Sequence, residues 1–490
     1  RFLPREPVQR LSTKIFLEDV SDLVGEHPPG PALFNRRSGA HRMLSLTQLS
    51  QSVQEHLDTT GGPTSFKWTI GVSDLSGRGL IATQDISAGE TLFVDIPLIY
   101  GPRAGKQVTR GCTVCYTLNP LKLFKCHKCA LTLCSVECQN TILHTNDCGI
   151  ISRWNNKVPI EEVDDAQLSR ALTPIRALLL NKKQRIIQSA LQANVSSEHG
   201  AEVRKIKEYF TIPQEDEEIM LSTCYVLDAN AFQIAVPFGR NELSLRGLYP
   251  VSSLMNHNCI PNTRHSFDKN RRMIVQAVKP IRAGCELFSC YSGLLWGTPA
   301  RRHHLYRTKH FWCKCDRCAD PTERGTMLAA LKCFSKDCPG SLLPIEPLKS
   351  STSWRCLECE MVVPAKNIAT IQSALGSLMG NLDFENLLQL ESFLVNRIDK
   401  YIPSCNQIVI DLQCRLIWML GETEGSRWQG ESFITIILVS SLIIMQLRTH
   451  GLAKRSTCRL FNREKMHQTF WSDYLFCRQN VNASPDQFGC

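Results

Sequence analysis

Cysteine is the residue type that most restricts what this chain can fold into. The sequence has 23 cysteines in 490 residues, and most of them fall in tight clusters between Cys112 and Cys359, several as Cys-x-x-Cys pairs. Disulfide-rich secreted scaffolds are usually short, whereas this chain is long and places its paired thiols beside histidines. The clusters therefore favour metal ligation over disulfide bonding.

Length and composition indicate a globular protein of several domains. At about 150 residues per domain the chain would form about three. Its hydrophobic fraction of 43% and charged fraction of 21% exclude a disordered tail, a collagen and a small all-β secreted domain. The net charge of +10 comes without a long basic run, so we expect no direct sequence-specific binding of nucleic acid.

Two segments leave alternatives open. The densest basic segment, 301–309, is interpreted as a solvated helix face, and the alternative is a surface for an acidic partner such as a histone region or nucleosomal DNA. The apolar run 432–447 has about 16 residues, fewer than the ~20 that span a bilayer. We expect it to be buried or to face a partner, with a membrane anchor as the alternative.

Residues 1–30 lack the apolar core of a signal peptide, and no membrane association is expected.

Segments with a strand-like pattern alternate along the chain with segments of helical spacing, which predicts an α+β fold. Short β-type segments separated by glycine turns lie at 68–72, 79–83, 91–96, 273–278 and 286–290. Apolar residues at helical spacing occupy 161–210 and 367–420. The expected parts, in chain order, are an N-terminal extension (1–66), the first part of a β-rich domain (67–111), a Cys/His finger (112–148), a helical insert (149–232), a β-rich core (233–311), a short cysteine motif (312–320), a candidate zinc ribbon (321–366) and a helical C-terminal region (367–490).

The first cluster has the ligand set of two tetrahedral zinc sites. Its ligands in chain order are Cys112, Cys115, Cys126, Cys129, Cys134, Cys138, His144 and Cys148. Structural zinc takes four Cys or His ligands. A two-residue gap lets both sulfurs of one turn reach the same ion, and a three-residue gap puts two ligands on one face of a helical turn. The segment is too small to build a core of its own, so the metal must hold it, and a zinc site supplies ~10–16 kcal/mol of folding energy.

Two further cysteine groups follow. The motif Cys313-x-Cys315-x2-Cys318 is one ligand short of a tetrahedral site, and the segment 253–262 contains a plausible donor. The group with ribbon-like spacing consists of Cys333, Cys338, Cys356 and Cys359. It predicts a fourth structural zinc, with buried free thiols as the alternative.

The spacing of the first cluster resembles the MYND zinc finger at every ligand position. In that family the first and third ligand pairs share one ion and the second and fourth share the other, a pairing that spacing alone does not decide. The resemblance therefore implies two ligand sets, which are Cys112, Cys115, Cys134 and Cys138, and Cys126, Cys129, His144 and Cys148. MYND fingers mostly take short proline-containing peptides, so a protein partner is implied.

A second resemblance covers the motif Asn256-His257-x-Cys259-x-Pro-Asn, which is followed by Gly-x-Glu-Leu and a tyrosine. This is the core motif of SET-domain methyltransferases, and the Cys-x-Cys-x2-Cys after it resembles their post-SET motif. With a MYND finger inserted ahead of the core, the chain resembles the SET and MYND domain-containing lysine methyltransferases. The resemblance implies that Cys259 is the missing fourth ligand of the post-SET zinc, which would keep the site rigid.

The same resemblance implies S-adenosylmethionine as cofactor and a protein lysine, in a histone or a non-histone protein, as substrate. Direct methyl transfer needs a neutral amine held in line with the methyl group, so positioning carries much of the rate. Glycines let the backbone approach the cofactor, and Asn and His supply directional hydrogen bonds. Tyr291 matches the catalytic tyrosine and also lines the cofactor site. The cofactor-site residues implied are Gly77, Arg78, Gly79, Asn230, Ser253, Asn256, His257, Tyr291 and Phe311.

The sequence departs from the family pattern at two places. Lys309 stands where the family often has an aromatic residue, and a cation there should repel the substrate ammonium. The usual Gly-Glu-Glu-Leu reads Gly-Cys285-Glu286-Leu, which keeps the second acid. Both departures resemble the divergent, arthropod-type branch. The alternative to an active enzyme is therefore a catalytically weak SET–MYND adaptor or corepressor scaffold. We expect a role in transcriptional regulation, a monomer, and residence in the nucleus and cytoplasm.

Overall fold

The computed structural model describes residues 45–75, 77–103, 110–118, 123–196, 199–234, 244–384, 386–396 and 398–422. The described chain divides into two compact units. The N-terminal unit holds 45–256 and 262–289, and the C-terminal unit holds 257–261 and 290–422. The apolar run 432–447 lies outside the described residues. Among those that are described, no helix has the length and apolar character needed to span a membrane.

Three small sheets form the β-rich part of the N-terminal unit. The first has the order β1 (Trp68–Val72), β2 (Arg78–Ala82), β14 (Glu286–Ser289), β11 (Asn256–His257). The second is β12 (Thr263–Phe267), β13 (Met273–Ala277), β3 (Thr91–Asp95), and the third is β4 (Ile99–Pro102), β10 (Leu245–Leu248), β9 (Phe232–Ile234). Every β-type segment predicted from the sequence is thus a strand. Side chains of β13 alternate between buried and half-buried positions, as expected of a strand with one face in the core.

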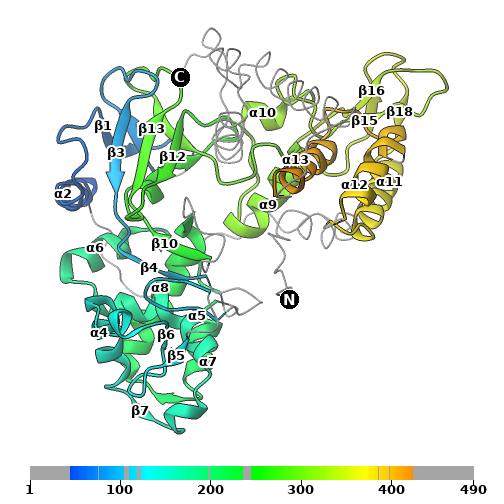
Figure 1. Ribbon diagram of the computed structural model, residues 1–490. Coiled ribbons are helices and arrows are strands. Elements are labelled where there is room, and N and C mark those ends of the chain that lie inside the picture. Colours follow the sequence, from blue (N-terminus) through cyan, green and yellow to red (C-terminus); the bar gives the residue numbers. More distant parts are fainter. Residues whose placement is uncertain are drawn as a thin grey trace. The chain divides into compact units, whose positions relative to one another are not determined.

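The other part of this unit is helical. Its helices and minor elements are β5 (Phe124–Lys125), β6 (Thr132–Leu133), α3 (Val136–Gln139), α4 (Ile142–Ile151), β7 (Asn155–Asn156), η3 (Ile160–Glu162), α5 (Asp165–Arg176), η4 (Ala177–Leu179), α6 (Lys182–Ala190), α7 (Ala201–Ile206), β8 (Phe210–Thr211), α8 (Gln214–Asn230) and η5 (Ser252–Leu254). Figure 1 shows β1, β3, β12 and β13 at one end of the unit and α4, α5 and α7 at the other, with β4 and β10 between them. One buried cluster contains Leu168, Leu172 and Ile175 of α5 together with Cys126 and Cys129, so the finger packs on this helix.

Helix α2 (Leu46–Leu57) lies in the described part of the predicted N-terminal extension. Its Ser45 and Gln48 form a capping box that fixes where the helix begins. Leu49 and Val53 are buried in the core cluster that also contains strands β1 and β3. His56 Nε2 lies 3.0 Å from the buried Asp95 carboxylate, which also accepts the backbone N–H of Ser252 at 2.8 Å. Helix α2 therefore packs into the hydrophobic core of the N-terminal unit.

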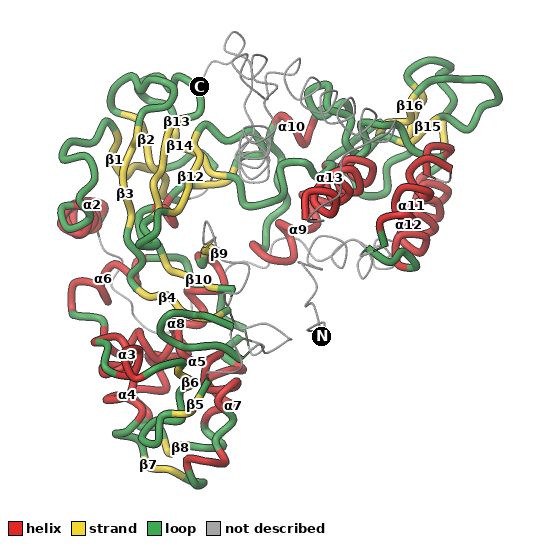
Figure 2. The backbone as a smooth tube through the Cα atoms, in the orientation of Figure 1, coloured by secondary structure: helices red, strands yellow, loops and turns green. Residues whose placement is uncertain are grey.

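The first helices of the C-terminal unit are α9 (Thr298–Lys309) and α10 (Asp316–Ala319). A four-stranded antiparallel sheet follows in the order β15 (Leu331–Lys332), β16 (Ser341–Pro344), β17 (Trp354–Cys356), β18 (Val362–Val363). Helices α11 (Ala365–Gly380), α12 (Leu387–Asn396) and α13 (Gln407–Glu422) complete it, with a 3-10 turn η6 (Ile398–Lys400). Figures 1 and 2 show α11 and α12 side by side next to this sheet. The mixture of small sheets and helices confirms the predicted α+β class.

Candidate metal centres and cofactor site

Four groups of cysteine and histidine side chains are each gathered around one point. Within each group the ligand atoms all lie within 4.8 Å of one another. Zinc–sulfur bonds of about 2.3 Å in a tetrahedron place the sulfurs about 3.8 Å apart. The groups are Cys112, Cys115, Cys134 and Cys138; Cys126, Cys129, His144 and Cys148; Cys259, Cys313, Cys315 and Cys318; and Cys333, Cys338, Cys356 and Cys359. These are the same four sets that the sequence and the family resemblance predict, including the interleaved pairing in the finger.

The first finger site is formed by sulfur atoms alone. Cys115 Sγ lies 3.4 Å from Cys134 Sγ, which lies 3.6 Å from Cys138 Sγ. Ser135 caps the short helix α3 by accepting the backbone N–H of Cys138 at 3.2 Å. The cap fixes the turn that brings Cys134 and Cys138 together. These two cysteines, separated by three residues, therefore belong to the same ligand group.

The second finger site contains a histidine whose ring is held by the backbone. His144 Nδ1 lies 2.6 Å from the carbonyl oxygen of Gln139, so the Nδ1 proton is donated there. Nε2 is left without that proton and lies 3.6 Å from Cys129 Sγ. A hydrogen bond of this kind sets the tautomer of a metal-binding histidine. His144 and Cys148 are one turn apart on α4, as their spacing predicts.

The third group lies wholly in the C-terminal unit. Cys259 Sγ is 3.8 Å from Cys313 Sγ and 3.5 Å from Cys318 Sγ. Cys259, Cys313 and Cys318 are buried, and Cys315 is half-buried. The structure therefore places Cys259 where the missing fourth ligand of the Cys-x-Cys-x2-Cys motif is expected.

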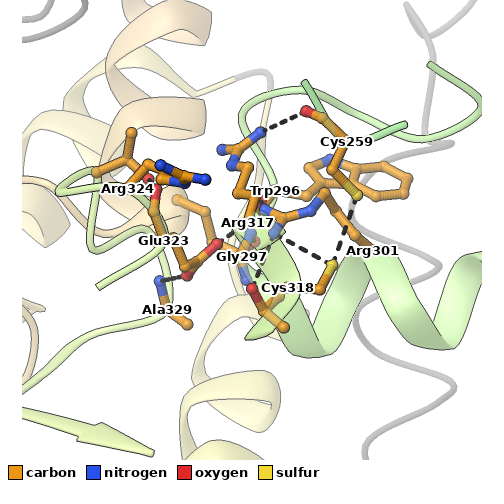
Figure 3. A network of polar contacts seen from close by, with 12 residues as sticks. Cys259, Trp296, Gly297, Arg301, Arg317, Cys318, Glu323, Arg324 and Ala329 are labelled. Carbon is orange, nitrogen blue, oxygen red and sulfur yellow. Dashed lines mark hydrogen bonds and ion pairs between the residues drawn. The ribbon is translucent and has the colours of Figure 1, made fainter. Parts of the chain in front are cut away.

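Three buried arginines contact residues of this third group, and Figure 3 shows two of them, Arg301 and Arg317, beside Cys259 and Cys318. Arg301 has no exposed side-chain surface; its Nη2 donates to Cys318 Sγ at 3.6 Å and its Nη1 to Glu323 Oε2 at 2.8 Å. Arg317 and Arg302 are buried as well. Arg317 donates to the carbonyl of Cys259 at 3.2 Å, and Arg302 donates to the carbonyl of Cys313 at 3.0 Å.

The charges of this shell complement a zinc–thiolate centre. A divalent ion with four thiolates carries a formal charge of −2, and the three arginines with Glu323 carry +2. Sequence reasoning missed the shell and was wrong about Arg301 and Arg302, which were interpreted as part of a solvated or partner-binding helix face. The reason is physical, because a helix face rich in arginine is buried only where an anionic centre compensates it.

Glycine and asparagine build the predicted cofactor turn in the N-terminal unit. Gly77 has φ +58°, and a Cβ built there would meet nothing within 4 Å, whereas a Cβ on Gly79 would lie 2.1 Å from Glu286 Oε1. The same oxygen accepts the Asn256 side-chain N–H at 2.7 Å, and Glu286 Oε2 accepts the Ser73 hydroxyl at 2.7 Å. Glu286 therefore locks the turn, and only glycine fits beside it.

Three other predicted cofactor residues bond to the backbone of this unit. Arg78 donates to the carbonyl of Ala190. Asn230 donates to the carbonyls of Gln192 and Val226, each at 2.7 Å. Ser253 donates its hydroxyl proton to Tyr249 O at 2.7 Å and lies 3.4 Å from Asn230 O. These bonds hold Asn230 and Ser253 next to one another at the end of α8.

His257, Tyr291 and Phe311 lie together in the C-terminal unit. The His257 ring centroid is 5.3 Å from that of Tyr291 and 5.9 Å from that of Phe311. His257 Nδ1 accepts the backbone N–H of Tyr291 at 2.9 Å. Burial lowers the pKa of His257 to about 3, so the neutral ring carries its proton on Nε2, 3.2 Å from Cys259 Sγ. Both ring nitrogens are thus engaged, and a cofactor contact of His257 would come from its backbone.

Lys309 extends over the face of Tyr291. Its Nζ lies 5.7 Å from the centroid of the Tyr291 ring, within the distance at which a cation is attracted by an aromatic face. The lysine that replaces the expected aromatic residue therefore lies against the predicted catalytic side chain.

Comparison with known proteins identifies the family. The SET domain family model matches residues 77–292. The SET domain-containing protein SmydA-8, isoform A, of Drosophila melanogaster is 33% identical over 393 residues, which are 78% of this chain and 84% of that protein. The histone-lysine N-methyltransferase SMYD3 of Mus musculus is 26% identical over 342 residues, 64% of this chain and 74% of that protein.

A human relative and one solved structure extend the comparison. The human N-lysine methyltransferase SMYD2 is 27% identical over 263 residues, 49% of this chain and 58% of that protein. The crystal structure of the SET domain of LSMT bound to lysine and AdoHcy aligns with 87% of this chain and 100% of its own, at 13% identity and a TM-score of 0.33. From the SET domain match and the SmydA-8 identity, the chain belongs to the SET and MYND domain-containing family of lysine methyltransferases, as an arthropod-type member.

Proposed function

We propose that the protein is an S-adenosylmethionine-dependent protein-lysine methyltransferase that acts on a histone or a non-histone protein. The observation that carries the proposal is the turn around Gly79, which Glu286 and Asn256 hold in a form that leaves no room for a side chain. It stands in a chain whose SET domain extends from this turn to Tyr291 and beyond. S-adenosylmethionine, when bound, supplies a methyl group on a positively charged sulfur for transfer to a lysine amine.

The chain's own residues position the reacting groups. Gly77 leaves open space beside the turn for the cofactor, Gly79 lets the Glu286 carboxylate pack against the turn, and Asn256 is oriented by its bond to Glu286. Tyr291 orients the substrate amine, and its backbone is tied through His257 to Cys259 of the third metal group. A zinc ion held by Cys259, Cys313, Cys315 and Cys318 would keep this connection rigid, and two further zinc ions would hold the finger.

Cofactor binding is the first test of this proposal. A ligand at 100 times its dissociation constant adds roughly 2.7 kcal/mol to the free energy of unfolding, which raises the Tm of a domain of 150–250 residues by roughly 5–10 °C. S-adenosylmethionine should give this shift. Gly79→Ala should lower the shift by at least half, whereas Gly149→Ala, in helix α4 where a Cβ meets nothing within 4 Å, should preserve it. An unshifted wild-type protein would contradict the proposal.

The position of Lys309 favours a second candidate, a SET–MYND adaptor with weak catalysis. A cation beside Tyr291 opposes the approach of a substrate ammonium. Under this alternative the protein binds S-adenosylmethionine but transfers methyl groups slowly, and Lys309→Tyr raises the rate. Arg307→Tyr is the matched control, because it removes a positive charge from an exposed position of the same helix.

The finger is proposed to recruit a partner protein through a proline-containing peptide, in transcriptional regulation. Val136 and Ile142 support this role, since they are 61% and 75% exposed on the finger and can contact such a peptide. We also propose that the protein is a monomer in the nucleus and cytoplasm. Loss of peptide binding in Val136→Ser/Ile142→Ser, with finger zinc retained, would support the finger's role. Unchanged binding would contradict it.

A further inference from the structure

The fourth cysteine group lies beyond the residues that match the SET domain. Cys333 Sγ is 3.5 Å from Cys359 Sγ, and Cys338 Sγ is 3.7 Å from Cys356 Sγ. Two turns supply the four cysteines. Cys333 and Cys338 lie between β15 and β16, Cys356 ends β17, and Cys359 follows it. The chain is therefore folded so that thiols separated by about 20 residues meet at one point.

The hairpin at Cys356 repeats the backbone of the two finger hairpins. In each, the first cysteine of a Cys-x-x-Cys pair donates its N–H to the carbonyl five residues later. The three bonds are Cys112 N to Thr117 O at 3.0 Å, Cys126 N to Leu131 O at 2.9 Å and Cys356 N to Met361 O at 2.9 Å. The two finger hairpins and the hairpin at Cys356 thus share the same backbone hydrogen bond.

The same three hairpins share a rare backbone conformation. The residue that follows the second cysteine is left-handed in each, although none is glycine: Tyr116 has φ 66°, Ala130 has φ 60° and Glu360 has φ 57°. Residues with a side chain disfavour this region, and they adopt it where surrounding structure requires it. Its recurrence after each Cys-x-x-Cys pair indicates that the same requirement, convergence of both sulfurs on one ion, acts at all three.

Local donors and a glycine complete the fourth group. The backbone N–H of Ser335 lies 3.4 Å from Cys333 Sγ, and that of Glu358 lies 3.4 Å from Cys356 Sγ. Such N–H groups stabilise thiolates, the form of cysteine that binds metal. A Cβ on Gly340 would lie 2.5 Å from Cys356 Sγ, so the backbone approaches the cluster closely.

We propose that Cys333, Cys338, Cys356 and Cys359 bind a fourth structural zinc ion. Four sulfur ligands in a closed tetrahedral set are typical of zinc in structural positions. The sheet β15–β18 consists of very short strands, two of them only two residues long, so few hydrogen bonds hold it together. The zinc ion would stabilise this sheet by linking its two turns.

The fourth ion also supports the helices of the C-terminal unit. Trp354 and Cys356 of the sheet share one buried cluster with Ile368 and Leu375 of α11 and with Phe393 of α12. Loosening the sheet would therefore uncover the inner face of these helices. We expect zinc loss at this site to expose α11 and α12 without removing the finger ions.

Zinc stoichiometry of the purified full-length protein tests the proposal. Native mass spectrometry should find four zinc ions per chain in the wild type and three in Cys356→Ser. Cys405→Ser is the control, since Cys405 lies in the same unit outside the four groups, and it should keep four. Hydrogen exchange in β15–β18 and α11 should rise in Cys356→Ser and remain unchanged in Cys405→Ser.

The outcomes that overturn the proposal are equally definite. Three zinc ions in the wild type, with Cys333, Cys338, Cys356 and Cys359 all alkylated in the folded protein, would identify free thiols. Iron in place of zinc, or two disulfides in this segment, would also refute it. If Cys356→Ser fails to fold, the wild-type zinc count and the alkylation pattern still decide.

Discussion

The buried arginine shell gives the sharpest structural prediction, at Arg301→Met. The substitution keeps an aliphatic stem but removes the cation that lies 2.8 Å from Glu323 and 3.6 Å from Cys318 Sγ. At an effective dielectric constant near 20, a unit charge 3.6 Å from a thiolate contributes about 5 kcal/mol of attraction. Glu323 would meanwhile keep a buried carboxylate whose described bond is to the backbone N–H of Ala329 at 3.0 Å.

The expected magnitude follows from these contacts. Removing one partner of a buried ion pair costs about 3–5 kcal/mol, so the Tm of the C-terminal unit should fall by roughly 6–20 °C at 2–4 °C per kcal/mol. The net charge of the three arginines with Glu323 also falls from +2 to +1, while the zinc ion with four thiolates keeps its formal charge of −2. Zinc should therefore pass faster from the third group to a chromogenic chelator.

The double variant Arg301→Met/Glu323→Gln separates the effects. It restores the shell charge to +2 and keeps an oxygen for Ala329 N–H, so zinc retention should recover and Tm should recover in part. Arg355→Met, at an exposed position of β17, is the control and should change the free energy of unfolding by less than about 0.5 kcal/mol. Equal Tm and zinc release in wild type and Arg301→Met, or no recovery in the double variant, would refute the reasoning.

Three further predictions concern the N-terminal unit. Gly79→Ala should lower S-adenosylmethionine affinity at least tenfold by isothermal titration, since its Cβ would lie 2.1 Å from the carboxylate that locks the turn; Gly149→Ala should not. Arg176→Met should cost about 3–5 kcal/mol in urea unfolding, because the buried Arg176 donates to Asp147 at 2.7–3.1 Å, and Arg176→Met/Asp147→Asn should recover part of the loss. Burial lowers the pKa of His265 to about 4, below the 6.5 of an unfolded histidine; the unfolded chain then binds more protons, so stability falls as pH drops from 6.5 to 4, and His265→Gln should flatten that slope. An unchanged affinity, unfolding midpoint or slope in the respective variant would contradict each prediction.

The ligand sets were predictable because zinc binding constrains sequence strongly. Two-residue and three-residue gaps have few alternative uses in a chain with thiols beside histidine. The pairing within the finger and the assignment of Cys259 came from family resemblance, since spacing leaves several pairings open. Strands were predictable where residues alternate, as in Met273–Ala277.

The arginine shell and helix α2 show where sequence reasoning ends. Arg301 and Arg302 are adjacent charged residues in a basic helix, a pattern typical of solvated faces, and their burial depends on Cys318 and Cys313, which come later in the chain. Their nearness in sequence to the cysteine motif is the one signal that could have indicated a role there. Helix α2 follows a segment rich in proline and glycine and was missed, although Ser45 and Gln48 form a capping box and Leu49, Val53 and Leu57 recur at helical spacing.

Transfer of a methyl group from S-adenosylmethionine to a protein lysine is the reaction that this chain is proposed to catalyse. Purified protein incubated with tritiated S-adenosylmethionine and histones or a cell lysate should label protein lysines, and Tyr291→Phe should suppress the label while cofactor binding and zinc content stay at wild-type levels. Wild-type protein that binds S-adenosylmethionine but labels nothing, with Lys309→Tyr equally silent, would contradict the assignment as a methyltransferase.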